Sequence, residues 1–134
     1  MSDLEKVGPL VDIFVGVSRP ASLALTQANR PVAPPVRVAA LFDTGASGSV
    51  IQQGISERLG LMPVGATQIV TATSSALCLT YSMRWVLPNG ITVDGTAIEA
   101  PLADSSFQVL IGRDVLKHCI LLYIGPENQF TVSI

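Results

Sequence analysis

The chain of 134 residues is 49% hydrophobic and only 13% charged, with a formal net charge of −2 at pH 7. The length predicts one domain over residues 1–134, with residues 1–8 as a polar N-terminal lead, and the apolar content excludes intrinsic disorder. A small negative charge without a basic cluster excludes nucleic-acid binding as the main function. The low charge also indicates that a partner, such as a second copy of the chain, covers some apolar surface.

No apolar run approaches the ~20 residues that cross a bilayer, and residues 1–6 carry acids without the apolar stretch of a signal peptide. We therefore expect a cytoplasmic protein that does not bind a membrane. The cysteines Cys78 and Cys119 fit no metal-ligand spacing, and His118 is the only histidine. Two free thiols, no metal site and no organic cofactor are expected.

In the first half of the chain, residues 9–18 alternate partly and are rich in Val and Ile, which predicts a strand. Residues 36–42 and 49–51 predict two more. Between the first two strands, residues 19–35 are expected to lack regular structure over much of their length and to form a surface excursion or an interaction arm. The reason is a set of four prolines, Pro20, Pro31, Pro34 and Pro35. A short helix is predicted over residues 52–61, with Gly60 at its end.

The second half is dominated by strand patterns. A turn at Ser74-Ser75 divides two of them, and Asn89-Gly90 is a strong signal for a hairpin turn. A short helix can form over residues 112–118. The predicted strands are 67–73, 76–87, 91–100, 107–111, 119–124 and 129–134. Many short strands with one or two short helices predict an all-β domain of the closed-barrel or sandwich type.

The apolar strand at 36–42 leads directly into Asp43-Thr44-Gly45-Ala46. A carboxylate at the end of a buried strand is costly unless it is hydrogen-bonded or functional. Thr44 can hydrogen-bond locally, and Gly45 permits a sharp turn. The tripeptide alone also fits an ordinary tight turn. The stretch nevertheless resembles the active-site loop of the aspartic proteases, and Ala46 makes it similar to the retroviral (retropepsin) branch.

A second motif, Leu110-Ile111-Gly112-Arg113-Asp114, resembles the second hallmark of retropepsins, in which a strand passes behind the catalytic loop and opens a short helix. The two motifs occur in the family's order, with room for two hairpins between them. The resemblance implies the closed retropepsin (acid protease) barrel. It also implies that Ile111, Gly112 and Arg113 support the loop, with Gly112 allowing a close backbone approach.

The resemblance further implies an aspartic endopeptidase that needs two carboxylates sharing one proton. The chain has one Asp-Thr-Gly, so the pair would come from Asp43 of two copies in a homodimer. Thr44 would lock the two loops, and residues 130–134 would join the subunits. A polypeptide would bind as an added strand under a flap. Its contacts would come from the residues Ala46, Ser47, Thr73, Ser74, Ser75 and Ala76.

Two departures from the family pattern stand out. Ser47 replaces an Asp that meets the Gly-Arg arginine in several retroviral enzymes, which leaves the partner of Arg113 open. The presumed flap tip, residues 71–78, contains no glycine. The alternative function is a catalytically weak or inactive dimerisation or peptide-binding module, because the same fold can serve that purpose.

Other residues have simpler interpretations. Tyr81 and Trp85 are predicted to be core or sheet-face residues, Asp104 is predicted to lie in a loop, and Asp114 at a helix cap. His118 is expected at a helix end, since no Gly-x-Ser-x-Gly elbow accompanies it. A phosphatase motif at residues 93–96 is rejected because Thr92 stands where the nucleophilic Asp would be required.

Overall fold

The computed structural model describes residues 10–70, 72–102, 106–124 and 129–133, and for residues 120–124 and 129–133 it describes the backbone alone. No helix in this part of the chain is long and apolar enough to cross a membrane. The elements follow the order β1 (Leu10–Val17), α2 (Arg19–Gln27), β2 (Val36–Phe42), β3 (Ser49–Ile51), α3 (Ile55–Arg58), β4 (Gly65–Val70), β5 (Ser75–Val86), the 3₁₀ turn η1 (Pro88–Gly90), β6 (Thr92–Glu99), β7 (Val109–Ile111), α4 (Arg113–Leu116), β8 (Ile120–Ile124) and β9 (Gln129–Ser133).

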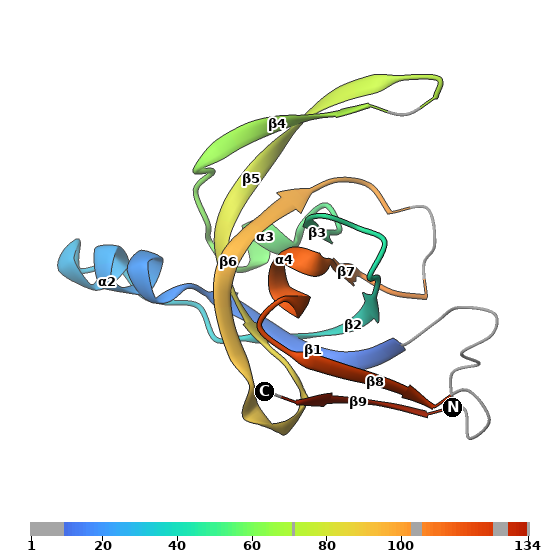
Figure 1. Ribbon diagram of the computed structural model, residues 1–134. Coiled ribbons are helices and arrows are strands. Elements are labelled where there is room, and N and C mark those ends of the chain that lie inside the picture. The colour runs from blue at the N-terminus through green and yellow to red at the C-terminus, as the bar shows by residue number, and fades with distance from the viewer. Residues whose placement is uncertain (1–9, 71, 103–105, 125–128, 134) are drawn as a thin grey trace.

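Six strands close into a barrel in the order β1-β2-β7-β3-β6-β5, because β5 pairs with β1 as well as with β6 (Figure 1). The pairs β2–β7 and β3–β6 are parallel, and the other pairs in the ring are antiparallel. Alternate side chains of each strand face the interior, as Val38, Ala40 and Phe42 of β2 do. The predicted all-β closed barrel is confirmed.

The barrel core is formed mainly by branched and aromatic side chains. Met83 and Trp85 of β5 are fully buried and Tyr81 is almost so, which means that both aromatic residues, predicted as core or sheet-face residues, lie in the core. Ile51 of β3 and Ile111 of β7 are also fully buried. The two short strands that flank the Asp43 region are therefore anchored in the core through their side chains.

The predicted strands correspond to β1, β2, β3, β5, β6 and β7 to within a few residues. Asn89-Gly90 forms the predicted hairpin turn, and both residues have the positive φ that such turns favour, 65° and 74°. The final hairpin is confirmed in β8 and β9, which pair only with each other among the described residues. Its turn, residues 125–128, lies outside the described residues.

Strand β5 is twelve residues long, and its two halves have different partners. Residues from Thr80 to Val86 pair with β6 in the barrel wall, whereas Ser75 to Thr80 pair with β4. The β4–β5 hairpin consequently extends beyond the barrel, and Figure 1 shows it arching over one end. Because Val70 pairs with Ser75, the described part of the connecting loop is 72–74. The predicted strand end at 73 and the turn at Ser74-Ser75 were wrong by a few residues.

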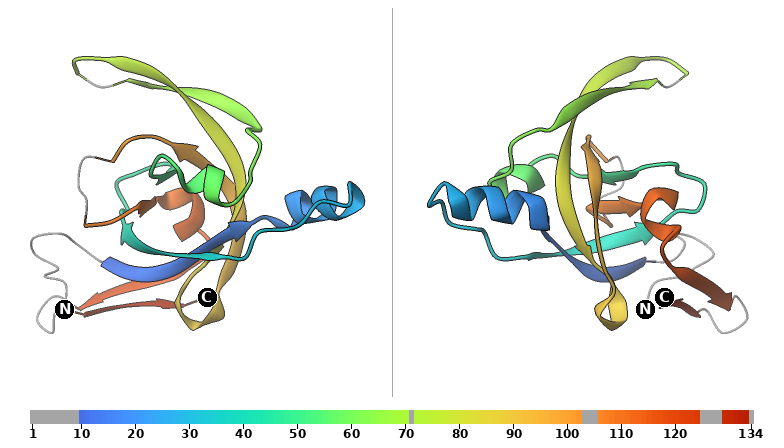
Figure 2. Two further views of the ribbon diagram at one scale, coloured as in Figure 1. Left: turned by 180° about the vertical axis from the view of Figure 1, so that it is seen from behind. Right: turned by 60° about the vertical axis from the view of Figure 1, so that its left-hand side comes forward.

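The expectation that residues 19–35 are largely irregular was wrong for α2, a nine-residue helix that projects from the barrel (Figure 2). Pro20 lies in the first turn, where its missing N–H and fixed φ suit a helix. The hydroxyl of Ser18 caps the start by accepting the N–H of Ala21 at 3.3 Å. Asn29, with φ of 55°, ends the helix, and the other three prolines all follow it.

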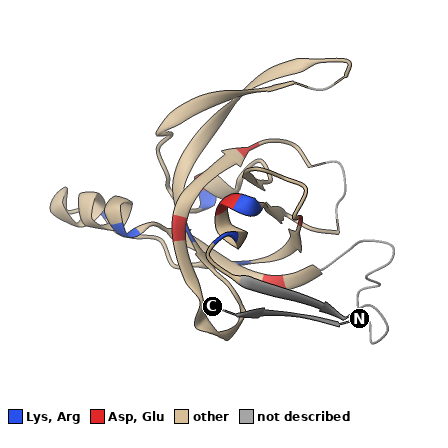
Figure 3. Ribbon diagram, in the orientation of Figure 1, with Lys and Arg blue, Asp and Glu red and all other residues tan. Residues whose placement is uncertain are grey.

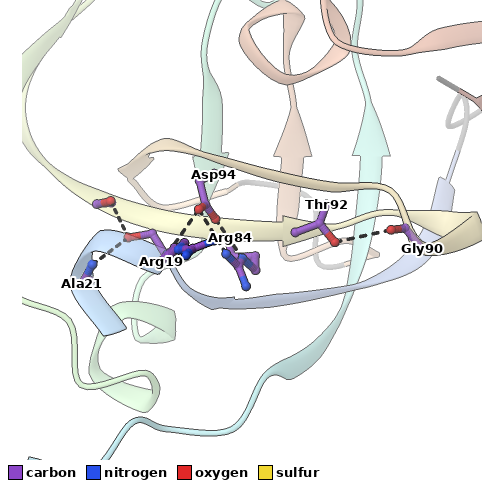
Figure 4. A network of polar contacts seen from close by, with 8 residues as sticks. Arg19, Ala21, Arg84, Gly90, Thr92 and Asp94 are labelled. Atoms are coloured by element: carbon purple, nitrogen blue, oxygen red, sulfur yellow. Dashed lines mark hydrogen bonds and ion pairs between the residues drawn. The ribbon is translucent and has the colours of Figure 1, made fainter. Parts of the chain in front are cut away.

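A polar network fixes the beginning of α2 on the barrel wall (Figure 4). Asp94 of β6 accepts the backbone N–H of Arg19 at 3.2 Å and two N–H groups of its cross-strand neighbour Arg84, at 2.9 and 3.2 Å. The hydroxyls of Ser18 and Ser82 are 2.7 Å apart. The hydrogen bond from Arg84 lowers the pKa of Asp94 below its ordinary value, so the carboxylate stays ionised near neutral pH.

The helix predicted over residues 52–61 is only four residues long in the structure, as α3. Gly54 has a left-handed φ of 98°, which prevents the helix from beginning earlier. Gly60, with φ of 64°, ends the helix as predicted. The helix predicted at 112–118 is confirmed as α4, and His118 follows its end.

Candidate active site

Asp43 directly follows β2, and its backbone and side chain are both held by hydrogen bonds. Its N–H donates to the carbonyl of Ile111 at 2.8 Å, which continues the parallel pairing of β2 with β7. Its Oδ1 accepts the N–H of Gly45 at 2.8 Å. A Cβ at position 45 would lie 3.1 Å from the same oxygen, so glycine suits this turn. The half-buried carboxylate is thus oriented by its own loop.

Gly112 lies directly behind this loop, as the sequence predicted. A Cβ at this position would lie 2.6 Å from the carbonyl oxygen of Gly48 and 2.9 Å from that of Ala46. Real side chains do not approach backbone atoms this closely, so only glycine fits. Ile111 is fully buried immediately before it.

Arg113 contacts the loop twice. Its backbone N–H donates to the carbonyl of Ala46 at 2.8 Å, and its guanidinium Nη1 donates to the carbonyl of Thr44 at 3.0 Å. The partner of Arg113 that the sequence left open is therefore the loop backbone. No ion pair joins Arg113 to a carboxylate within the described ranges. Ser47, at the position where an acid would pair with it, is exposed.

The sequence analysis did not assign Ser49 or Asp114 to this site. Ser49 is completely buried, and its hydroxyl donates to Oδ1 of Asp114 at 2.7 Å while accepting the N–H of Gly112 at 3.0 Å. The N–H of Ser49 also donates to Oδ2 of Asp114 at 3.2 Å. The prediction of Asp114 as a helix cap holds in part. The N-cap residue is Gly112, but Oδ1 of Asp114 accepts the N–H of Val115 at 2.9 Å in the first turn of α4, in addition to its contacts with Ser49. The one sequence feature that could have indicated the Ser49–Asp114 contact is a serine at the start of a buried strand.

The predicted flap residues all lie at the free end of the β4–β5 hairpin. Thr73, Ser74, Ser75 and Ala76 are exposed, and the side-chain amide of Gln68 in β4 donates to the hydroxyl of Ser75 at 3.2 Å. In Figure 1 the hairpin arches above the part of the barrel that holds the β2–β3 loop. The structure thus places these residues on one projecting element, with the loop centred one to two residues earlier than predicted.

The stem of the hairpin carries apolar side chains that the sequence analysis did not single out. Val70, Leu77 and Leu79 are 73%, 74% and 45% exposed. All three belong to one face of the hairpin, because Leu79 pairs with Ala66, Leu77 with Gln68, and Val70 with Ser75. By strand alternation this is also the side of β5 on which Tyr81, Met83 and Trp85 enter the core.

Charges are sparse around the site. Figure 3 shows acidic and basic residues scattered over the ribbon, with one basic and one acidic residue adjacent on α4. Within the described ranges, no group of three or more His, Cys, Asp or Glu side chains is placed to hold a metal ion. The carboxylate of Asp43 is therefore the chemical group around which the loop, Gly112 and Arg113 are arranged.

A family model described as aspartyl protease matches residues 35–115, which include both motifs. Among solved structures, the chain is similar to the EIAV protease complexed with the inhibitor HBY-793, with a TM-score of 0.59 and 18% identity over 88% of this chain and 92% of that one. It is also similar to the solution structure of the simian foamy virus (mac) protease, with a TM-score of 0.49 and 12% identity over 80% and 92% of the two chains.

No curated protein matches the sequence. The family match covers more than half of the chain and includes the Asp43 loop together with Gly112 and Arg113. The EIAV protease structure agrees with it at the level of the fold. This chain is a member of the aspartyl protease family and has the retropepsin-like fold.

Proposed function

We propose that the chain acts as one retropepsin-like domain and that two copies form an aspartic endopeptidase. The observation that carries this proposal is the Asp43 carboxylate, which the N–H of Gly45 orients at 2.8 Å in a loop that Gly112 and Arg113 support from behind. A purely structural turn needs no half-buried carboxylate at its first position.

In this proposal Asp43 and its symmetry mate share one proton, because two carboxylates a few ångströms apart do not both ionise. The ionised carboxylate takes a proton from a water molecule held between the two. That water attacks the carbon of the scissile carbonyl, while the protonated carboxyl donates a hydrogen bond to the carbonyl oxygen. The proton that was taken up then passes to the leaving amine, and the pair returns to its singly protonated state. Thr44, exposed in one chain, is the residue proposed to hydrogen-bond across to the second loop.

The proposed substrate is an extended polypeptide with apolar side chains near the scissile bond. The support comes from Val70, Leu77 and Leu79, which are exposed on the hairpin face that continues into the core. An exposed apolar face on a projecting hairpin favours binding of another chain. The tip residues Thr73, Ser74, Ser75 and Ala76 and the loop residues Ala46 and Ser47 are proposed to add mainly backbone hydrogen bonds.

The proposed dimer contact is the edge of the β8–β9 hairpin. Among the described residues these strands pair only with each other, so each offers an unpaired edge. Unpaired strand edges readily add strands from a second chain. The one Asp-Thr-Gly in the sequence makes such an assembly necessary for a two-carboxylate mechanism.

The test is the Asp43→Asn variant, assayed by the cleavage of a denatured protein. We expect hydrolysis to fall by about 10²–10⁴-fold, the usual contribution of a proton-transfer group, with folding and dimerisation retained. Asp12→Asn is the matched control, because Asp12 is an exposed carboxylate that pairs with Arg37 in the wall. An inactive parent that still dimerises and binds peptides would support the module alternative instead.

A further inference from the structure

The carboxylate of Asp114 is bound to the catalytic loop through a single residue, Ser49. One carboxylate oxygen accepts the Ser49 hydroxyl at 2.7 Å, and the other accepts the Ser49 N–H at 3.2 Å. The same hydroxyl accepts the N–H of Gly112 at 3.0 Å. Ser49 is completely buried, so removing its hydroxyl takes a partner away from both the Asp114 carboxylate and the Gly112 N–H at a site closed to solvent.

Ser49 fixes the far end of the Asp43 loop. The near end is held where the N–H of Asp43 donates to Ile111, and the loop then runs through Gly48 into Ser49, the first residue of β3. The carbonyl oxygen of Gly48 is the atom to which a Cβ on Gly112 would lie closest. A shift of Ser49 would therefore move the backbone between residues 44 and 48, and with it the N–H of Gly45 that orients the carboxylate.

Asp114 connects the Ser49 contact along the chain to the proposed dimer interface. Asp114 lies in the first turn of α4, and α4 is followed after three residues by β8. Backbone hydrogen bonds from Lys117, His118 and Cys119 to α4 make this connection short and continuous. A displacement of the C-terminal hairpin would thus reach Asp114 through a single helical segment.

We propose that Ser49 and Asp114 are positioning residues, which transmit the placement of the C-terminal hairpin in the dimer to the Asp43 loop. This inference rests on the proposed protease activity. It implies that dimerisation does more than supply a second carboxylate, because it also sets the geometry of the loop in each subunit. Loss of the contact should then lower kcat in a protein that remains fully dimeric.

The test compares Ser49→Ala with Ser56→Ala. Ser56 is a closely matched control, since it is 3% exposed and donates its hydroxyl and its N–H to the carboxylate of Glu99 at 2.6 and 3.3 Å. None of these Ser56 bonds, within the part of the chain described, reaches the Asp43 loop. Both variants lose a buried hydroxyl bonded to a carboxylate, and both should lose stability.

We expect Ser49→Ala to lower kcat by about tenfold to a hundredfold, because the change leaves buried polar groups without a partner. KM and the dimer dissociation constant should stay unchanged. Ser56→Ala should keep the parental kcat. The assay is run at chain concentrations at which sedimentation shows only dimers. A parental kcat in Ser49→Ala, an equal loss in Ser56→Ala, or recovery of kcat at higher concentration would overturn the inference.

Asp114→Asn serves as the second variant and keeps the inference testable if Ser49→Ala does not fold. An amide offers one acceptor oxygen where the carboxylate offers two, so this variant should lose less kcat than Ser49→Ala. The double variant should lose less kcat than the two single losses combined, because both changes disrupt the bond between the Ser49 hydroxyl and the Asp114 carboxylate. A folded Asp114→Asn protein with parental kcat, or additive losses, would overturn the inference. An inactive parent would instead refute the proposed protease function itself.

Discussion

Gly112 and Gly48 face each other so closely that a Cβ on Gly112 would lie 2.6 Å from the carbonyl oxygen of Gly48. This contact brings β7 and the start of α4 against the back of the Asp43 loop. It leaves no room for any side chain at position 112, and it explains why the strand-to-helix junction begins with glycine.

Gly112→Ala should therefore destabilise the protein by about 1–3 kcal/mol, the usual cost of overpacking a buried site. It should also reduce peptide hydrolysis by more than the decrease in the folded fraction explains. Gly95→Ala is the control, because its Cβ would meet Trp85 at an ordinary distance of 3.6 Å. Urea unfolding and a cleavage assay measure the two effects. Equal stability of Gly112→Ala and the parent would contradict the close approach.

Arg113→Met should lower activity while leaving stability nearly unchanged. The change removes the guanidinium bond to the carbonyl of Thr44 but keeps the backbone bond to Ala46. Because Arg113 is exposed, we expect a stability loss of about 1 kcal/mol or less and a fall in kcat of about tenfold. Arg58→Met, at an exposed arginine at the end of α3, controls for the loss of a surface charge. Thermal unfolding and steady-state kinetics are the measurements, and parallel behaviour of the two variants would exclude a specific role for Arg113.

Mixing parent chains with excess Asp43→Asn chains should suppress the activity of the parent. If the subunits exchange freely, the fraction of dimers that carry two Asp43 carboxylates falls as the square of the parent fraction. Specific activity should also fall on dilution below the dimer dissociation constant. Activity that falls only in proportion to the parent fraction, or an active monomer in sedimentation, would rule out a shared carboxylate pair.

Acid should weaken the attachment of α2 through Asp94. The pKa of this carboxyl is lowered in the folded protein by its hydrogen bond with Arg84, so its contribution to stability is present above the ordinary pKa of about 3.9 and is lost as the pH falls through the lower, folded value. The pair is partly exposed, with side chains 36% and 32% accessible, so the contribution should be about 1 kcal/mol or less. Unfolding of the parent and of Asp94→Asn at pH 6 and pH 2 measures it. The difference between the two proteins should shrink at pH 2, and a constant difference would contradict this role.

The tip of the β4–β5 hairpin should become protected from amide hydrogen exchange when an inhibitor with a hydroxyl-bearing isostere binds. Residues 72–76 have no glycine, and φ > 0 is disfavoured for Ser and Thr, so the tip has few alternative backbone shapes. We expect slow exchange over residues 72–78 in the complex and faster exchange in the free protein. Protection at Asn89-Gly90 instead would identify the β5–β6 turn as the flap.

Local patterns in the sequence predicted much of the framework. The alternation of apolar residues predicted most of the strands, because it must match the two faces of a pleated strand. Asn89-Gly90 predicted its hairpin, since few residues accept positive φ at both positions. The resemblance of the Asp43 and Gly112 motifs to those of retropepsins implied that the strand before Gly112 passes behind the Asp43 loop, and the close approach of Gly112 to Gly48 agrees with it.

Other features depended on contacts between residues far apart in the chain. Helix α2 was missed because the prolines suggested a loop, although Ser18, Pro20 and Asn29 together carry the signals for its start and its end. The contact of Ser49 with Asp114 could not be predicted, since neither residue type is unusual at its position and only the closure of the barrel brings β3 beside α4. The partner of Arg113 was likewise decided by tertiary structure, because a guanidinium without a nearby acid binds whichever backbone carbonyl the fold presents to it.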